Sequence, residues 1–290
     1  MGAEYLESYA DCGLYVMQGR LSPPEEGRFQ CFPRTQWEAE LLLAPQVPLR
    51  GIEWIFDLHG KRANPLETPR ARAELANKLK QSGVSVVSIC ADYFMDCPLV
   101  RVEKALLEER IAKLSWLISI CPELDISRIV LPFVDASMIS SSKDSEVVLF
   151  VLNHVLGQAV KCGVELHLEA DLNPRDFKSF LDEIKHPFIK VNYDSGNSGS
   201  LGYSPIEEFA AYGERIGSFH IKDRALGGGT VPLGSGNVDF VNLRKALIDV
   251  DYRGDFVMQI ARGTPGDELN WLKKADTVAR KWLRGDHIVN

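Results

Sequence analysis

The feature that most constrains the fold is an alternation of short apolar runs with longer, helix-like segments, clearest between residues 164 and 262. Four runs there have strand composition, and each ends close to a polar residue: VELHLE at Glu169, IKVNYD at Asp194, SFHIK at His220 and DFVMQIAR at Gln259. Successive residues of a strand point to opposite faces, so each run has one apolar face and one face with polar groups. Segments of about a dozen residues separate the runs, as parallel βα units require.

The same alternation extends over the whole chain. We expect four earlier strands, near residues 13–18, 51–57, 84–91 and 127–133. Helices are expected over about 35–44, 69–82, 100–120, 145–161, 174–184, 205–215, 239–250 and 267–283. Thr35 and Glu38 form a capping-box pattern at the start of the first helix. Eight strands, each followed by a helix, predict an α/β fold: a single-domain (β/α)8 TIM barrel over residues 1–290, close to the usual size.

Composition narrows the class of protein further. No apolar run approaches the ~18 residues of a membrane span, and the acidic N-terminal segment lacks a signal-peptide pattern. The net charge of −7 disfavours binding to a phosphate backbone. Six cysteines without CxxC pairing are typical of reduced thiols. We therefore expect a cytoplasmic protein with no nucleic-acid or membrane partner; the sequence leaves a homodimer open.

The polar residues at the strand ends predict a metal site, because the C-terminal ends of barrel strands meet at one rim. Two carboxylates, an imidazole and a carboxamide suit a divalent cation, so Glu169, Asp194, His220 and Gln259 are the candidate ligands. Glu169 could instead be one arm of a buried ion pair, and a lone strand histidine is often a core residue. The alignment of the carboxylates with His220 favours the metal site.

Three further inward-facing residues are candidates for binding or proton transfer. Glu53, on the second strand, is the best candidate for a second acid or base, with an ion pair to an arginine as the alternative. Lys222 lies just above His220 and could hold a substrate oxygen or phosphate, or form a salt bridge to a rim carboxylate. His167 lies one layer below Glu169, where a core or supporting position is favoured over a ligand.

At these residues the chain resembles the xylose isomerase-like superfamily of sugar isomerases and epimerases, over nearly its whole length. The strongest marks are HLEAD (167–171), NYDSGN (192–197), HIKD (220–223) and PLGSGNVDF (232–240). MQGRLSP (17–23) and GIEWIF (51–56) resemble a narrower group of sugar-phosphate isomerases and epimerases. Together and in this order the motifs are specific for the superfamily, and much less so for the substrate.

The resemblance implies a divalent metal ion (Mn, Mg, Co or Zn) held by a glutamate, an aspartate, a histidine and a final glutamate. In its epimerases the two glutamates are also bases on opposite faces of the substrate. Glu169, Asp194 and His220 match this set, but Gln259 stands at the last position, and Asn197 stands where many members have a substrate-binding histidine. A carboxamide can ligate a hard cation but cannot act as a base, so we expect a one-base enzyme or a member that has lost catalysis.

These observations predict a metal-dependent isomerase or epimerase that acts on a small sugar, sugar phosphate or related polyol through an enediolate. Its catalytic residues would be Glu169, Gln259 and Glu53, and its substrate-binding residues Lys222, Asn197, Arg262 and His167. The Arg20–Arg34 loop and the glycine-rich 227–236 loop are expected to cover the site. The alternatives are a lyase on a polyol-like or cyclic keto acid, a zinc AP endonuclease-like protein and a non-catalytic barrel. The single convincing ligand histidine and the acidic charge disfavour the endonuclease.

Overall fold

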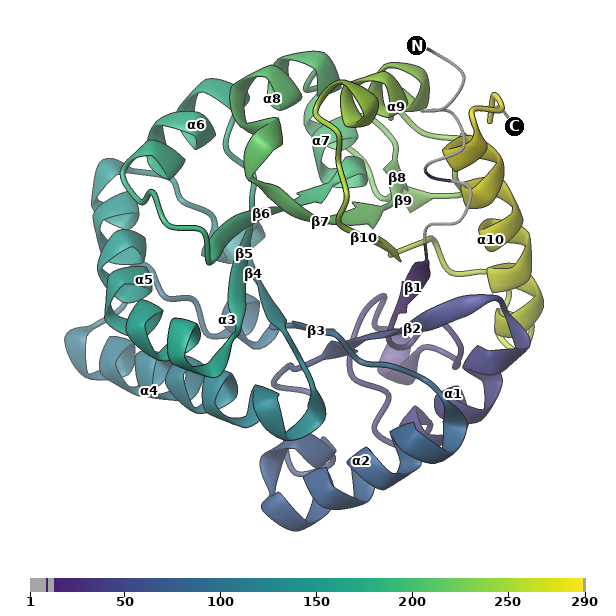
Figure 1. Cartoon of the computed structure of the whole chain (residues 1–290), viewed down its shortest axis with the longest axis horizontal. Helices are drawn as coiled ribbons and strands as arrows, with labels where there is room; N and C mark the ends of the chain where they lie inside the picture. Colours follow the sequence, from purple (N-terminus) through teal and green to yellow (C-terminus); the bar gives the residue numbers. More distant parts are fainter. Residues whose placement is uncertain (1–8, 10–12, 289–290) are drawn as a thin grey trace.

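Eight parallel strands form a closed barrel in the computed structural model, which describes residue 9 and residues 13–288 (Figure 1). The strands follow the ring order β1-β10-β7-β6-β5-β4-β3-β2. Their bounds are β1 Leu14–Met17, β2 Leu49–Ile55, β3 Ser88–Cys90, β4 Arg128–Phe133, β5 Glu165–Ala170, β6 Ile189–Asp194, β7 Ile216–Ile221 and β10 Asp255–Met258. The barrel confirms the fold class that the alternating pattern predicted.

α-Helices surround the barrel and cover the outer faces of its strands (Figure 1). Their bounds are α1 Trp37–Leu43, α2 Pro69–Ser82, α3 Tyr93–Asp96, α4 Lys104–Ile120, α5 Ser142–Cys162, α6 Pro174–Asp182, α7 Ser195–Leu201, α8 Pro205–Tyr212, α9 Phe240–Asp249 and α10 Glu268–Arg284. Local sequence fixes several of these ends. The Thr68 hydroxyl caps the start of α2, and Gly83 ends it in the left-handed conformation that glycine tolerates best.

The start of α1 differs from its expected capping box. The Thr35 hydroxyl donates to Glu25 and not to the helix, Glu38 accepts from Lys78, and Gln36 at the N-cap position makes no side-chain capping bond. The capping-box prediction is therefore wrong, because both side chains found tertiary partners. Short elements that the sequence pattern did not predict are α3, α7 and the antiparallel pair β8 (Asp223–Arg224) and β9 (Thr230–Val231).

The predicted strand parity places the core correctly. Residues of the apolar parity, such as Leu166, Val191 and Phe219, are fully or almost fully buried. Phe219 and Trp282 of α10 lie with ring centroids 6.1 Å apart, which joins the barrel to its helical layer. Burial of each such side chain contributes about 1.5–3 kcal/mol.

The segment before β1 lies outside the described residues except for Tyr9 and Gly13, and so does the expectation about its N-terminal signal. Among the residues that are described, no helix is both long and apolar enough to cross a membrane. The cysteines at 31, 90, 97, 121 and 162 are free thiols.

Candidate active site and metal centre

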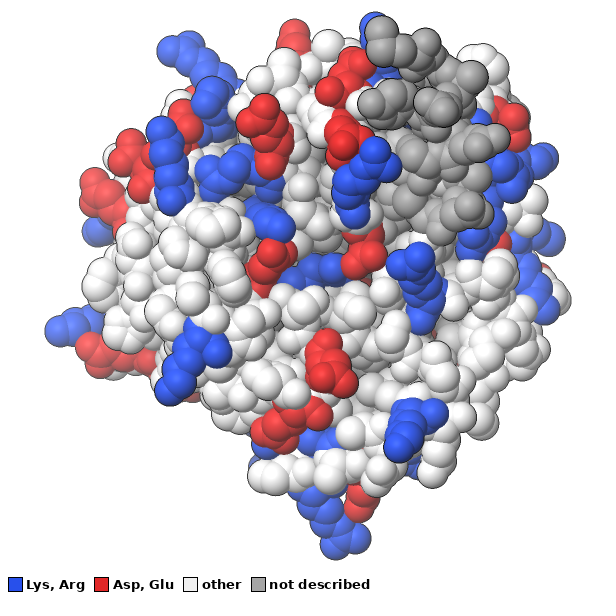
Figure 2. Space-filling model, in the orientation of Figure 1, with Lys and Arg blue, Asp and Glu red and all other residues white. Residues whose placement is uncertain are grey.

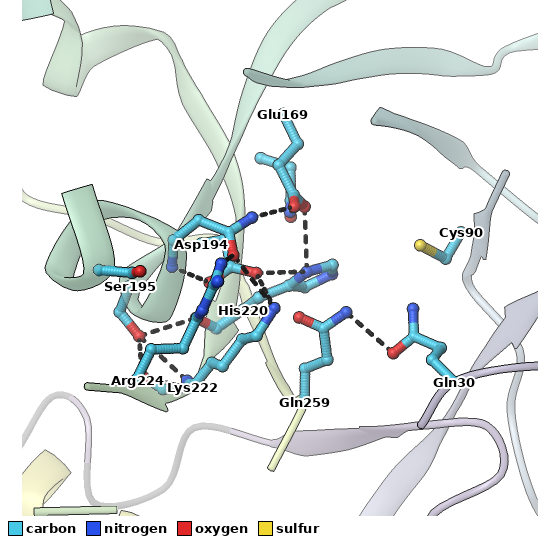
Figure 3. Close-up of polar contacts among 12 residues, drawn as sticks. Gln30, Cys90, Glu169, Asp194, Ser195, His220, Lys222, Arg224 and Gln259 are labelled. Carbon is cyan, nitrogen blue, oxygen red and sulfur yellow. Dashed lines mark hydrogen bonds and ion pairs between the residues drawn. The ribbon is translucent and has the colours of Figure 1, made fainter. Parts of the chain in front are cut away.

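Three potential ligands meet at the C-terminal ends of adjacent strands. Glu169 lies on β5, Asp194 ends β6 and His220 lies on β7, and one ligand atom from each falls within 4.8 Å of the others (Figure 3). All three side chains are buried. Asp194 and His220 are also direct register partners across β6 and β7, so the parallel pairing itself brings their side chains together.

A buried carboxylate fixes the orientation of His220. The Nε2 atom of His220 lies 2.7 Å from Glu53 Oε1, and both side chains are fully buried. Burial lowers the pKa of His220, but the charges of Glu53 and Glu169 outweigh it and raise the pKa to about 10. Burial also raises the pKa of Glu53, and the contact with His220 overcomes this and lowers it. A carboxylate behind the distal nitrogen is the usual support of a metal-binding histidine.

The other ring nitrogen of His220 faces the two carboxylates. Its Nδ1 atom lies 3.3 Å from Glu169 Oε2 and 4.0 Å from Asp194 Oδ2. Although buried, Nδ1 forms no hydrogen bond of acceptable geometry within the described part of the chain. An orphaned imidazole nitrogen beside two carboxylate oxygens fits a divalent cation, which would require Nδ1 to be deprotonated.

Amide and ammonium groups hold the two carboxylates in place. Asn192 Nδ2 donates to Glu169 Oε2 over 2.7 Å, and Asn197 Nδ2 donates to Glu169 Oε1 over 2.9 Å. Lys222 Nζ lies 3.1 Å from Asp194 Oδ2 and 3.2 Å from Asn197 Oδ1. Lys222 therefore forms the salt bridge that was one of its two expected roles, and it lines the cavity as well.

Gln259 follows β10, and its side-chain carbonyl oxygen lies on the side of His220 (Figure 3). Its Nε2 atom donates to Gln30 Oε1 over 3.0 Å, while Oε1 is buried without a hydrogen-bond partner among the described residues. Figure 3 shows Oε1 turned away from Gln30, toward the side of His220. Gln30 Oε1 also accepts from Arg20 Nη2 (2.9 Å), and Gln30 Nε2 donates to Asp92 Oδ2 (2.8 Å). Because Gln30 offers Gln259 only an acceptor, the Gln259 amide is oriented with its oxygen free.

A cavity of about 620 Å³ opens above these residues. Its lining includes Glu169, Asn197, Lys222 and Gln259 of the expected site. Arg28, Phe29 and Gln30 contribute from the Arg20–Arg34 loop, and Gly229 with Thr230 from the glycine-rich loop, so both loops lie against the cavity. Figure 2 shows acidic and basic side chains interspersed over one face of the molecule, without a large area of one sign.

Three residues expected at the site belong neither to the cavity lining nor to the three-ligand cluster. Glu53 is enclosed behind His220, and its partner is that histidine and not the arginine that was the alternative. His167 contacts Ser218 (2.7 Å) and Glu165 (2.9 Å) and is completely buried beneath the site. Arg262 donates to two carbonyl oxygens of the Arg20–Arg34 loop, at 22 and 29, and so holds that loop.

Sequence reasoning did not select several acids that line the cavity, among them Asp92 and Asp171. Burial raises the pKa of Asp92 to about 6, and burial with the charge of Glu169 raises the pKa of Asp171 to about 6. Asp92 follows the last residue of β3 by two positions, and Asp171 follows Ala170, the last residue of β5. The four later strands were recognised by a polar residue at the end of an apolar run. The same signal is present in ICAD, residues 89–92.

The family model for xylose isomerase-like TIM barrels matches residues 43–281. The chain belongs to this family. This confirms the family resemblance that the motifs indicated.

An Escherichia coli protein provisionally named L-ribulose-5-phosphate 3-epimerase SgbU is 24% identical over 85% of this chain and 90% of its own length. The structure of an L-ribulose 3-epimerase superposes with a TM-score of 0.73 at 17% identity, covering 94% of each chain. The IOLI protein with a bound zinc atom superposes with a TM-score of 0.72 at 16% identity, covering 92% of this chain and 97% of that one. At these identities the two structures show the shared fold.

Proposed function

We propose that the protein is a metal-dependent epimerase or isomerase of a small ketose or ketose phosphate. The observation that carries this proposal is the buried His220, whose Nε2 is committed to Glu53 while Nδ1 faces Glu169 and Asp194. The names of the E. coli relative and of the ribulose epimerase structure support the substrate class, and the zinc-bound neighbour supports a metal. Glu169, Asp194 and His220 would hold the ion, with Gln259 Oε1 as a weak fourth ligand.

Glu169 is the proposed base. When bound, the divalent ion would polarise a substrate oxygen next to the reacting carbon. Glu169 would take the proton from that carbon to give an enediolate, while Asn192 and Asn197 keep its carboxylate oriented. The Arg20–Arg34 loop would exclude water, because Phe29 and Gln30 lie on the cavity wall.

One corner of the cavity suits a phosphate group. Arg224 and Thr230 are register partners on β8 and β9, and both line the cavity beside Gly229. The cavity lining as a whole is acidic, with carboxyl groups at 57, 92, 96, 135, 169 and 171 against basic groups at 28, 222 and 224. A phosphorylated ketose would therefore place its phosphate at the Arg224 corner and its reacting carbons at the carboxylates.

Calorimetry and turnover together test the proposal. Mn²⁺ should bind the wild type at one site, and Asp194→Asn should weaken that binding by at least tenfold. Glu208→Gln is the matched control, because Glu208 is a buried carboxyl whose hydrogen bonds within the described residues go to Tyr193, Ser198 and Tyr212. Equal Mn²⁺ affinity in the wild type and Asp194→Asn would rule out the site.

Turnover is then followed by ¹H NMR with L-ribulose 5-phosphate and L-ribulose. We expect epimer or isomer formation that requires Mn²⁺. A product with new absorbance from a conjugated double bond would identify a lyase instead, and a Mn²⁺-loaded protein that converts neither sugar would contradict the proposed substrates.

A further inference from the structure

One part of the cavity wall is built from three different parts of the chain. In the ring order β1 lies opposite β5, β10 is next to β1, and β3 lies two strands from β1 and two strands from β5. Gln30 follows β1, Asp92 follows β3 and Gln259 follows β10, and hydrogen bonds join the three in the order Gln259–Gln30–Asp92. All three line the cavity, and of the three only Asp92 can gain and lose a proton at neutral pH.

We propose that Asp92 is the second proton-transfer residue of this site, acting on the substrate face opposite to Glu169. The inference rests on the proposed epimerase function. It replaces the expectation of a single base, which followed from reading Gln259 alone. The carboxyl group absent from the end of β10 is present at the end of β3, two hydrogen bonds away.

Two other titratable groups that line the cavity near Asp92, Asp57 and Cys90, are committed to other contacts. Both oxygens of Asp57 accept backbone N–H groups, from Phe32 over 2.8 Å and from Gly60 over 2.6 Å. Burial raises the pKa of the Cys90 thiol well above its ordinary range, and the thiol donates to Asp92 Oδ1 over 3.1 Å. Cys90 is thus a neutral donor that supports Asp92.

The charged groups around Asp92 allow it to act in both protonation states. Burial is the main factor that raises its pKa to about 6, and the charges of Asp57 and Glu169 add to it. Hydrogen bonds from Gln30 and Cys90 lower the pKa of Asp92 and so partly oppose this rise. Arg20 in turn donates a hydrogen bond to Gln30. A carboxyl group that titrates close to neutral pH is suited to general acid–base catalysis.

The proposed step transfers one proton from the substrate to Glu169 and one proton from Asp92 to the substrate. Glu169 as carboxylate takes the proton of the C–H bond, and the electron pair of that bond remains on the substrate as the enediolate. Asp92 as carboxylic acid then donates its proton to the same carbon from the other face, which inverts the centre. The two carboxyl groups have exchanged protonation states and return to their initial states by proton exchange with water.

Hydrogen–deuterium exchange in D₂O distinguishes proton removal from one face of the substrate carbon from proton removal from the other. The probe is L-ribulose 5-phosphate, or L-ribulose where the wild type prefers it, and each epimer is followed by ¹H NMR. In Asp92→Asn, epimer formation should fall by roughly 10²–10⁴, as for loss of a general acid–base group. The epimer whose proton Glu169 removes should still exchange that proton for deuterium, and the other epimer should exchange none.

Asp171→Asn is the matched control. Asp171 also lines the cavity and has a pKa raised to about 6, but it follows β5 on the side of Glu169. Its loss should leave the ratio of exchange to epimerisation as in the wild type. Asp92→Asn that retains both epimerisation and exchange from both epimers would overturn the inference, and an inactive wild type would instead refute the proposed function.

A measurement independent of turnover and of the folding of Asp92→Asn titrates the wild type. The ¹³C carboxyl resonance of Asp92, assigned by its absence in the spectrum of Asp92→Glu, should titrate near pH 6. A resonance that stays in the carboxylate position from pH 4 to pH 8 would also overturn the inference, because no proton could then be supplied.

Discussion

The Gln259 side chain is oriented by the loop that covers it, and this predicts a mixed effect of Gln259→Glu. The new carboxylate would give the metal site a third negative charge, so Mn²⁺ affinity should rise. It would also place an acceptor against Gln30 Oε1, which already accepts from Arg20. Gln30 cannot turn round without losing its bond to Asp92. The metal-free variant should therefore be destabilised by about 1–3 kcal/mol, as for a buried acceptor left unpaired.

Thermal and urea unfolding with and without Mn²⁺ measure the two effects separately. Gln259→Leu serves as the comparison, because it removes the ligand oxygen without adding charge. A metal-free Gln259→Glu variant as stable as the wild type would show that Gln30 does not constrain this position.

At the residue scale, the sequence predicted which polar residues of adjacent strands lie together, but not which side chains pair across the barrel. Strand parity was enough to bring Glu169, Asp194 and His220 together, because their three strands are adjacent in the ring. The pairing of Glu53 with His220 joins residues 167 positions apart. Which distant side chains meet inside a barrel depends on the stagger of its strands, and no local pattern encodes that. Asp92 carried a local signal that was not used.

Carboxylates hold both ends of the Arg20–Arg34 loop in place. The lowered pKa of one of them, Glu25, predicts how its contribution to stability depends on pH. Glu25 accepts from the Thr35 backbone and hydroxyl, from Arg34 and from His59. Burial raises its pKa, and these bonds together lower it to about 2. Because the folded pKa is depressed, Glu25 stabilises the fold fully above its ordinary pKa near 4.5, and the contribution is lost as the pH falls toward 2.

Glu25→Gln should therefore lower the free energy of unfolding by about 1–2 kcal/mol at pH 7, less than a fully buried hydrogen-bonded charge contributes, because solvent screens the partly exposed Glu25. The difference from the wild type should shrink steadily between pH 4.5 and pH 2. Urea unfolding at a series of pH values measures it, with the exposed neighbour Glu26→Gln as control. A difference that is constant with pH would contradict the role of the Glu25 charge.

Elements with strong terminal signals were predicted well, and elements fixed by tertiary contacts were not. The range predicted for α2 matches the structure at both ends, because Thr68, Pro69 and Gly83 are local capping residues. By contrast, α7 is a seven-residue helix composed mainly of glycine and serine, and its N-cap is Asp194 itself. Such a composition has low helix propensity, so the helix depends on burial and on that cap.

A charged pair also joins two strands across the end of the barrel at which the strands begin. Arg128 on β4 lies 2.6 Å from Asp255 on β10, and Arg128 is almost completely buried. Asp255→Asn should destabilise the whole barrel by about 1–3 kcal/mol, because it removes the carboxylate in contact with a buried guanidinium. Asp182→Asn removes the same charge from an exposed pair with Lys178 and should leave the stability close to that of the wild type. Equal urea midpoints for the two variants would contradict this view of Arg128.

The hydrogen bond between Gln30 and Gln259 spans 229 positions of the chain, and it joins the loop after the first strand to the end of the last. A ribosome that adds about 5–20 residues per second needs on the order of 10–50 s to make the intervening segment. During that time β1 has no β10 to pair with, and the apolar face of its partner strand β2 is only partly covered. The nascent chain therefore needs protection from aggregation longest at its beginning, and the catalytic cavity is the last part of the molecule to be completed.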